Sequence, residues 1–298
     1  MNDSTHQPAY LLEPAFLRRL EQAALASRRA LAGRGKGERR SPRRGTSVEF
    51  SDFRAYAPGD DLRYLDWNAF ARLRRLFLKL FVEEEDLQVH ILVDTSGSMD
   101  FGNPHKLQWA RQAAAALGYL GLCGGDRVRL YGYADQQFRA SRVFRGRGTA
   151  VEAFEWLLRL EAGGETRLRA GVDYLARSLT GPGIIFLLSD LLTPDWEPAL
   201  GRLAVTGGEA CVLQLMAPEE FSPGGSGDIE MVDAETGETR EITMGASVVR
   251  RYVKERDEFL ASVRSSCLRY GFPYLFQETS TPVPDAILRS LRRVGVVQ

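Results

Sequence analysis

The chain has 298 residues, of which 44% are hydrophobic and 26% are charged, a composition that excludes a largely disordered or collagen-like protein. Its 39 basic residues balance its 39 acidic residues, so the formal net charge is zero. Because proteins that coat nucleic acid usually carry a basic excess, this balance disfavours non-specific nucleic-acid binding.

Cysteine usage and hydropathy indicate a protein of a reducing compartment. The three cysteines lie far apart in the sequence and form no C-x-x-C motif, so the sequence indicates neither a disulfide framework nor a cysteine-rich zinc site. The first residues lack the pattern of a signal peptide, and no apolar stretch reaches the roughly 18 residues that a spanning helix needs. We therefore expect a cytoplasmic protein without a membrane span.

The first third of the chain combines a helix, an arginine-rich loop and a small β structure. Apolar residues recur at helical spacing over 11–31, and the Gly/Arg-rich segment 33–45 predicts a loop. Residues 18–44 carry a charge of +8; we favour a solvated loop that pairs with acids elsewhere, such as 83–86, over an arm for an acidic partner. The alternation in 76–82 predicts a strand that pairs with 46–50.

From residue 88 onward, strands and helices alternate. Short apolar runs predict strands at 88–93, 127–133, 138–144 (an edge strand), 184–188 and 210–216, and amphipathic segments predict helices at 106–122, 149–160, 168–179 and 195–206. This alternation predicts a Rossmann-like, doubly wound α/β sheet with helices on both faces.

The C-terminal part contains an insertion and then returns to the main fold. Residues 221–227 predict a loop, and 229–232 with 239–242 predict a β-hairpin. A helix at 247–270, a strand at 273–276 and a helix at 287–293 follow. We expect an N-terminal subdomain over 1–86 and a sheet domain over 87–298, with the hairpin insertion at about 218–245.

The segment His90-Ile-Leu-Val-Asp94-Thr95-Ser96-Gly97-Ser98-Met99 carries the most chemical information. An apolar strand ends at Asp94, and hydroxyls follow at alternate positions, Ser96 and Ser98. The carboxyl ends of the strands form the ligand crevice of an open α/β sheet, so we expect these side chains to converge there. One carboxylate and two hydroxyls are hard oxygen ligands, suited to Mg²⁺, Mn²⁺ or Ca²⁺.

Two further candidate ligands occur where the predicted fold needs them. Thr166 lies just before the helix at 168–179, and Asp190 ends the strand at 184–188. This combination resembles the von Willebrand factor type A (vWA) domain and its metal-ion-dependent adhesion site. The resemblance implies that Asp94, Ser96, Ser98, Thr166 and Asp190 bind a divalent cation, with Mg²⁺ expected first and Mn²⁺ or Ca²⁺ as alternatives.

Charge counting indicates how such a site would act. Asp94 and Asp190 contribute −2, which balances a divalent cation, and the hydroxyls are neutral. In families with this site, a carboxylate of the partner protein completes the metal shell. The alternatives are a metal that only cross-links three loops, or side chains that only cap turns.

A second block precedes the sheet and is dense in Asp, Arg and aromatic residues. Its pattern R-x-Y-x-P-G-D-D-x-R-x-x-D-W-x-x-x-A-R begins at Arg54 and is followed by an acidic run and the Asp94 loop. Read alone, it predicts an ion-paired turn in which arginines contact aspartates. Its candidate site residues are Arg54, Tyr56, Gly59, Asp60, Asp61, Arg63, Asp66, Trp67 and Arg72.

This block is similar to a bacterial family catalogued as domain of unknown function number fifty-eight. Members are often encoded beside MoxR-type AAA+ ATPases, so the resemblance implies a partner or adaptor of such an ATPase. The protein that it binds would then be the ATPase or its client. We therefore expect a non-enzymatic, metal-dependent protein-interaction module. Many relatives carry membrane helices, which we do not expect here.

Two other function classes fit less well. A Mg²⁺-dependent phosphatase using Asp94 as nucleophile would need a second aspartate where Ser96 stands, so the leaving group would lack an evident acid. The chain also has no G-x-x-x-x-G-K-[ST] loop of a P-loop ATPase. Nucleic-acid binding through residues 34–44 would lack the aromatic residues that stack on bases.

Overall fold

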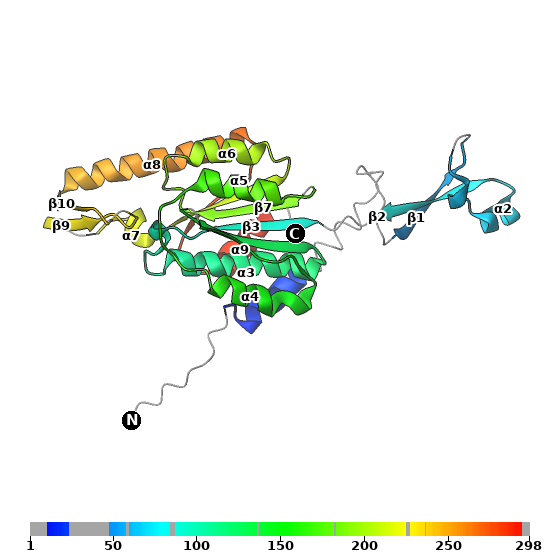
Figure 1. Cartoon of the computed structure of the whole chain (residues 1–298), viewed down its shortest axis with the longest axis horizontal. Helices are drawn as coiled ribbons and strands as arrows, with labels where there is room; N and C mark the ends of the chain where they lie inside the picture. The colour runs from blue at the N-terminus through cyan, green and yellow to red at the C-terminus, as the bar shows by residue number, and fades with distance from the viewer. Residues whose placement is uncertain are drawn as a thin grey trace, which may run out of the picture. The chain divides into compact units, whose positions relative to one another are not determined.

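The computed structural model describes residues 11–23, 48–57, 60–83, 87–135, 137–181, 183–224, 227–235 and 237–293. The chain divides into two compact units (Figure 1). One contains residues Met1–Ala30 and Leu87–Gln298, and the other contains Leu31–Asp86. Each unit is described by itself.

The larger unit is built on a seven-stranded, mostly parallel sheet within the described residues. The strand order is β11-β8-β7-β3-β4-β5, and β6 also pairs with β4. Strands β5 and β6 run antiparallel to β4. The strands are β3 (Gln88–Asp94), β4 (Arg127–Ala134), β5 (Gln137–Ala140), β6 (Phe144–Arg145), β7 (Gly183–Ser189), β8 (Glu209–Met216) and β11 (Tyr274–Glu278).

We number the six strands β3, β4, β5, β7, β8 and β11 from 1 to 6 along the chain. Read from β5 to β11, their order in the sheet is then 3-2-1-4-5-6, which is the order of a doubly wound sheet. The order reverses between β3 and β7, and ligands of such sheets bind at the carboxyl ends of the strands at that point. Asp94 ends β3, and Asp190 directly follows β7. The predicted Rossmann-like α/β sheet is therefore confirmed, and it places both aspartates at the reversal point.

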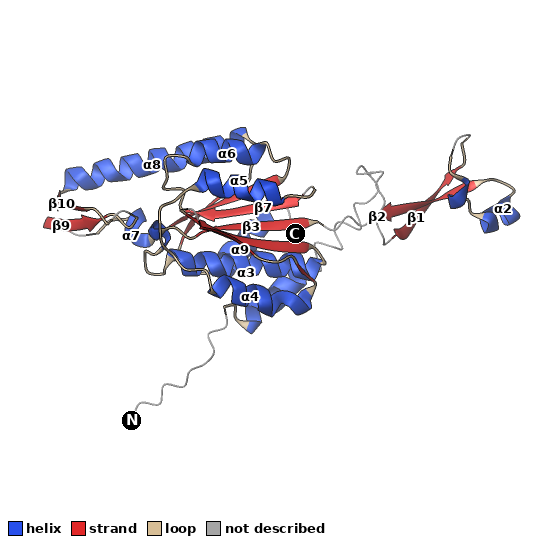
Figure 2. Cartoon of the chain, in the orientation of Figure 1, coloured by secondary structure: helices blue, strands red, loops and turns tan. Residues whose placement is uncertain are grey.

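Helices cover both faces of the sheet (Figure 2). One buried cluster joins the strands to the N-terminal helix, α3, α4 and α9, and the other joins them to α5, α6 and α8. Along β3, Ile91 belongs to the first cluster and Leu92 to the second, as expected for a strand buried on both faces. The helices are α3 (Lys106–Gly124), α4 (Ala150–Leu158), α5 (Leu168–Ser178), α6 (Trp196–Ala204), α7 (Pro218–Phe221), α8 (Ala246–Arg269) and α9 (Val283–Arg293).

The N-terminal helix belongs to the sheet unit, and our assignment of all residues 1–86 to one subdomain was wrong in this respect. The helix covers 14–23 of the described residues. Phe16 and Leu20 are buried in the same cluster as α3, and the Tyr119 hydroxyl of α3 donates to Glu21 at 2.6 Å. Burial of this apolar face against α3 is what attaches the helix to the larger unit.

The smaller unit contains a two-stranded antiparallel ribbon. Strand β1 (Val48–Ala55) pairs with β2 (Phe77–Glu83), which confirms the predicted pairing, and the register shifts between Phe50 and Asp52. A 3-10 turn, η1 (Leu62–Tyr64), and α2 (Trp67–Leu73) connect the strands. The arginine-rich segment 33–45 and the acidic residues 84–86 lie outside the described residues.

The insertion after β8 begins with a helix that we did not predict. α7 (Pro218–Phe221) precedes the expected 221–227 loop and ends at its first residue, and Pro218 is favourable in its first turn. β9 (Gly227–Val232) and β10 (Thr239–Met244) then form the predicted antiparallel hairpin. The expected strand at 138–144 is divided into β5 and β6, with the Ser141 hydroxyl between them accepting from Leu130 N at 3.0 Å.

A buried histidine makes the stability of the sheet depend on pH. His90 on β3 is 3% exposed, and its Nδ1 lies 3.0 Å from the Tyr131 hydroxyl. Burial, with a smaller contribution from the Arg129 charge, lowers the pKa of His90 to about 4. The unfolded chain, with a histidine pKa of about 6.5, therefore takes up this proton first as the pH falls.

We expect the stabilising effect of neutral His90 to be complete above about pH 6.5 and lost progressively towards pH 4, at a cost of about 2–3 kcal/mol. Urea unfolding of the wild type and His90→Gln across this range measures the effect. The variant should lose less stability on acidification, and an identical pH dependence of both proteins would contradict the prediction.

Candidate functional site

The loop after β3 holds the first predicted ligands. Asp94 ends the strand, and its Oδ1 accepts from the backbone N–H of Ser96 at 2.9 Å. Ser96 is buried, and its hydroxyl lies 3.0 Å from that of Ser98 within the turn η2 (Gly97–Met99). The alternation of polar side chains thus brings one carboxylate and two hydroxyls into a single turn.

Asp94 is fully buried and accepts hydrogen bonds from side chains of two neighbouring strands. Its Oδ2 accepts from the Tyr133 hydroxyl of β4 at 2.9 Å and from the Ser189 hydroxyl of β7 at 2.6 Å. Burial, together with the nearby charge of Asp190, raises the pKa of Asp94 to about 6. The structure therefore places a second buried carboxylate close enough for its charge to disfavour the ionisation of Asp94.

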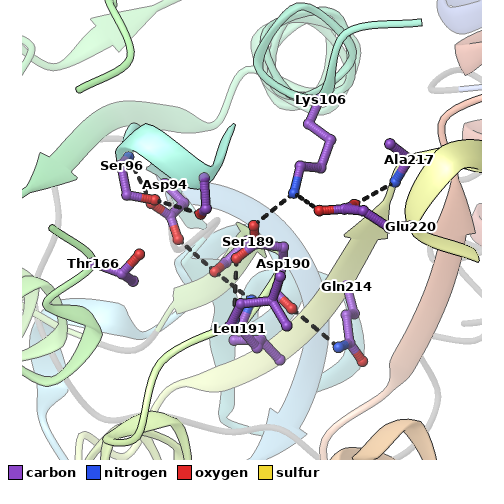
Figure 3. A network of polar contacts seen from close by, with 12 residues as sticks. Asp94, Ser96, Lys106, Thr166, Ser189, Asp190, Leu191, Gln214, Ala217 and Glu220 are labelled. Carbon is purple, nitrogen blue, oxygen red and sulfur yellow. Dashed lines mark hydrogen bonds and ion pairs between the residues drawn. The ribbon is translucent and has the colours of Figure 1, made fainter. Parts of the chain in front are cut away.

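The second and third loops meet the first at the same edge of the sheet (Figure 3). Gly97 N donates to Gly164 O at 2.8 Å, and Gly163 N donates to Thr95 O at 2.9 Å, which ties the Thr166 loop to the Asp94 loop. Asp190 follows β7 and accepts from Leu192 N at 3.1 Å. The predicted residues Asp94, Ser96, Ser98, Thr166 and Asp190 thus lie on three adjoining loops.

A buried lysine stands beside Asp190. Lys106, the first residue of α3, donates from Nζ to Asp190 Oδ2 at 2.9 Å and to Glu220 Oε1 at 2.5 Å, and its side chain has no exposed surface (Figure 3). Burial alone would lower the pKa of Lys106, but the charges of Asp190 and Glu220 outweigh it and raise the pKa above its usual value. Lys106 is therefore a permanent cation of this site.

A carboxylate of the hairpin also reaches the site. Glu235, in the turn between β9 and β10, accepts from the Thr166 backbone N–H at 3.0 Å and from the Thr166 hydroxyl. The donor set thus consists of carboxylate and hydroxyl oxygens, which suit Mg²⁺, Mn²⁺ or Ca²⁺. Among the described residues, no three His, Cys, Asp or Glu side chains gather as a metal-binding group, so such a cation would depend on the hydroxyls.

The block of Asp, Arg and aromatic residues that begins at Arg54 forms ion-paired turns in the smaller unit. Arg54 Nη2 lies 2.8 Å from Asp60 Oδ1, and this hydrogen bond lowers the pKa of Asp60. Arg63 contacts Asp61 through Nη2 at 2.6 Å. Both pairs join an arginine to an aspartate, as expected for an ion-paired turn.

Other residues of the block have local structural contacts. Asp66 caps α2 by accepting from Asn68 N and Ala69 N at 2.9 and 3.0 Å. Tyr56 N donates to Leu76 O, Trp67 is 64% exposed beside Phe70, and Arg72 lies near the end of α2. Gly59 lies outside the described residues.

Sequence reasoning missed the residues that join the loops of the site, namely Lys106, Tyr133, Ser189, Glu220 and Glu235. Lys106 is one of four lysines in an arginine-rich chain, and this rarity is only a weak indication that a lysine is needed at that position. Ser189 directly precedes Asp190, so it lies at the predicted strand end, but nothing in the pattern marks it as a partner of Asp94. Nothing in the sequence around Glu235 distinguishes it from an ordinary turn residue.

Comparison with solved structures finds distant likenesses. The conserved hypothetical protein BatB from Bacteroides thetaiotaomicron is 15% identical, with a TM-score of 0.43 over 70% of this chain and 98% of that one. The VWA domain of SpRpn10 is 10% identical, with a TM-score of 0.39 over 68% of this chain and 94% of that one. The strand order given above, rather than these likenesses, defines the fold.

Curated relatives come from mycobacteria. The uncharacterized protein Rv1480 of Mycobacterium tuberculosis is 26% identical over 284 residues, which cover 92% of this chain and 89% of the relative. The uncharacterized protein MAV169 of Mycobacterium avium is 30% identical over 113 residues, or 38% of this chain and 66% of the relative. Residues 52–259, which include the block at Arg54 and the Asp94 loop, match the family "Protein of unknown function DUF58", and the chain belongs to that family.

Proposed function

We propose that this protein is a non-enzymatic protein-interaction module whose binding site contains a divalent cation, with Mg²⁺ expected first. One observation carries the proposal: two buried carboxylates, Asp94 and Asp190, lie at the reversal point of the sheet, where hydroxyls of two loops adjoin them. A cation there would relieve the repulsion between the carboxylates. Asp94, Ser96, Ser98, Thr166 and Asp190 would hold it.

The cation would supply a positive charge to which a carboxylate of a partner protein can bind. The charge balance supports this role. When all groups are ionised, Lys106 (+1) offsets Glu220 (−1), so Asp94 and Asp190 leave −2 for a divalent cation. A MoxR-type AAA+ ATPase as the partner is inferred from the family resemblance alone.

The contacts of Asp94 favour a ligand over a nucleophile. Both carboxylate oxygens accept hydrogen bonds, and the residue is fully buried, whereas a phosphatase nucleophile must reach a substrate phosphorus. A phosphatase of this kind would also need a general acid at position 96, and the serine there cannot act as one. Within the described part of the chain, no helix has the length and apolar character needed to cross a bilayer.

The test combines cation binding with partner capture. Isothermal titration with Mn²⁺ or Mg²⁺ should show one saturable site in the wild type, and Thr166→Ala should weaken binding about tenfold or more by removing the oxygen of one proposed ligand. Thr206→Ala is the matched control, because the Thr206 hydroxyl donates to Leu203 O near the end of α6, away from the three loops of the site.

Pull-downs from the native host, with Mg²⁺ or with EDTA, then identify partners by mass spectrometry. We expect capture of an ATPase that depends on Mg²⁺ and is lost in Thr166→Ala. If the variant loses the cation but captures the same partner equally well, the metal-bridged interaction is wrong.

A further inference from the structure

A carboxylate at the tip of the hairpin insertion, Glu235, is hydrogen-bonded to one of the proposed metal ligands, Thr166. Glu235 accepts two hydrogen bonds from one residue, through Oε2 from the Thr166 backbone N–H at 3.0 Å and through Oε1 from the Thr166 hydroxyl. Thr166 is 8% exposed and Glu235 is half-buried, so little solvent separates them. A second carboxylate could approach this hydroxyl only after Glu235 leaves.

The hairpin tip makes a second, independent contact with the site. A Cβ added to Gly97 would lie 2.5 Å from the backbone oxygen of Ala234, so the absence of a side chain at Gly97 permits the tip to pack there. Gly97 belongs to the Asp94 loop, whereas Thr166 belongs to the next loop. The tip therefore covers two of the three loops that form the site.

The turn itself holds Glu235 in place. Gly237 N donates to Asp233 O at 2.9 Å, with Gly237 in the left-handed region at φ +72°. Glu235 N donates to Asp233 Oδ1 at 2.9 Å, and Asp233 N donates to Glu238 O at 2.8 Å. This network fixes the backbone on both sides of Glu235, so its carboxylate is preorganised towards Thr166.

The two strands that carry the tip, β9 and β10, have few buried side chains, in contrast to the well-connected turn between them. Most described residues of β9 and β10 are exposed, and Met244 at the end of β10 is the one that is buried. Segments with few buried apolar contacts open at low free-energy cost. The contacts at Thr166 and Gly97 therefore supply a large share of what keeps the hairpin on the site.

The contact between Glu235 and Thr166 would depend on what else is bound at the site, because the contact brings an additional negative charge there. Asp94, Asp190, Glu220 and Glu235 contribute −4 when ionised and Lys106 contributes +1, so the hairpin raises the negative charge of the site from −2 to −3. A divalent cation would favour the added carboxylate, and a partner carboxylate would compete for the same position.

We propose that Glu235 is an intramolecular stand-in for the partner's carboxylate, and that the β9–β10 hairpin blocks the site until a partner displaces it. This inference rests on the proposed function. It assigns to the insertion a regulatory role, and it predicts that the partner presents an Asp or Glu to the position that Glu235 now holds.

The experiment uses the full chain, Mn²⁺ as the probe and acetate as a minimal carboxylate. Water-proton relaxation reports how many exchangeable waters the bound Mn²⁺ retains. Glu235→Ala removes the stand-in, and Glu241→Ala is the matched control, an exposed glutamate on β10 of the same hairpin.

In the wild type and Glu241→Ala, bound Mn²⁺ should show low relaxivity and little response to acetate. In Glu235→Ala, we expect higher relaxivity, Mn²⁺ binding weakened about tenfold, and a fall in relaxivity when acetate is added. Amide hydrogen exchange in 237–244 should also be faster in Glu235→Ala than in Glu241→Ala, with or without Mn²⁺.

The outcomes separate the two proposals. Saturable Mn²⁺ binding with the same relaxivity, acetate response and exchange in Glu235→Ala as in the wild type would overturn the stand-in role and leave the metal site intact. Absence of saturable Mn²⁺ binding in all three proteins would overturn the metal site and the stand-in role together.

Discussion

Lys106→Met is expected to lower the free energy of unfolding by about 3–5 kcal/mol, the range found when one partner of a buried ion pair is removed. The side chain of Lys106 is fully buried and lies 2.9 Å from Asp190 and 2.5 Å from Glu220. Methionine fills a similar volume but leaves both carboxylates without their cation. Urea unfolding at neutral pH without divalent cations measures the loss.

Lys254→Met is the matched control for this prediction. Lys254 is another of the four lysines, but its side chain is 76% exposed and its contact with Glu258 on α8 is 3.7 Å long. Such surface pairs contribute about 0–0.5 kcal/mol. If Lys106→Met costs no more than Lys254→Met, the buried pair does not stabilise the fold as argued.

A cation should partly replace the missing ammonium. In Lys106→Met, the charge near Asp190 becomes more negative, so saturating Mg²⁺ should raise the free energy of unfolding more than it does in the wild type. The variant Lys106→Met/Glu220→Gln should recover part of the stability without Mg²⁺, because one of the two unpaired charges is gone.

Asp94→Asn is expected to weaken divalent-cation binding about 100-fold or more, because it removes one of the two charges that would balance the cation. The same change should leave the cation-free protein at least as stable as the wild type. The amide keeps the size of the carboxylate but carries no charge, so it removes both the cost of burying that charge and the repulsion with Asp190, which together raise the pKa of Asp94 to about 6. Titration calorimetry and urea unfolding, each with and without Mg²⁺, measure the two effects.

Asp173→Asn provides the comparison for Asp94→Asn. Asp173 is a carboxylate of α5 that pairs with Arg202 at 2.6 Å, and its loss should leave cation affinity unchanged. Wild-type affinity in Asp94→Asn would refute the ligand role of Asp94. A large loss of cation-free stability would instead indicate that the charge of Asp94 serves the fold.

The elements of the sheet were predictable because each follows from a local pattern. The run at 184–188 is apolar throughout and became β7, next to β3 at the centre of the sheet, and the amphipathic segment 168–179 became α5. The ends of those strands were therefore predictable too. This is why the sequence alone assigns Asp94 and Asp190 to one edge of the sheet.

The contacts that regulate and balance the site were not predictable, because they join distant segments. Lys106 and Glu220 are 114 residues apart, and Thr166 and Glu235 are 69 residues apart. No periodicity specifies which residue of a turn will meet which loop. The N-terminal helix shows the same limit, since its apolar face was visible in the sequence but its packing partner, α3, was not.

The place of that helix decides where the protein can be shortened. A chain beginning at Leu87 would keep every strand of the sheet yet lose Phe16 and Leu20, and the apolar surface of α3 that they cover would face water and favour aggregation. The other unit, residues 31–86, lies in the sequence between the two segments of the larger unit, so the N-terminal helix and the sheet that it packs against come from chain segments on either side of it.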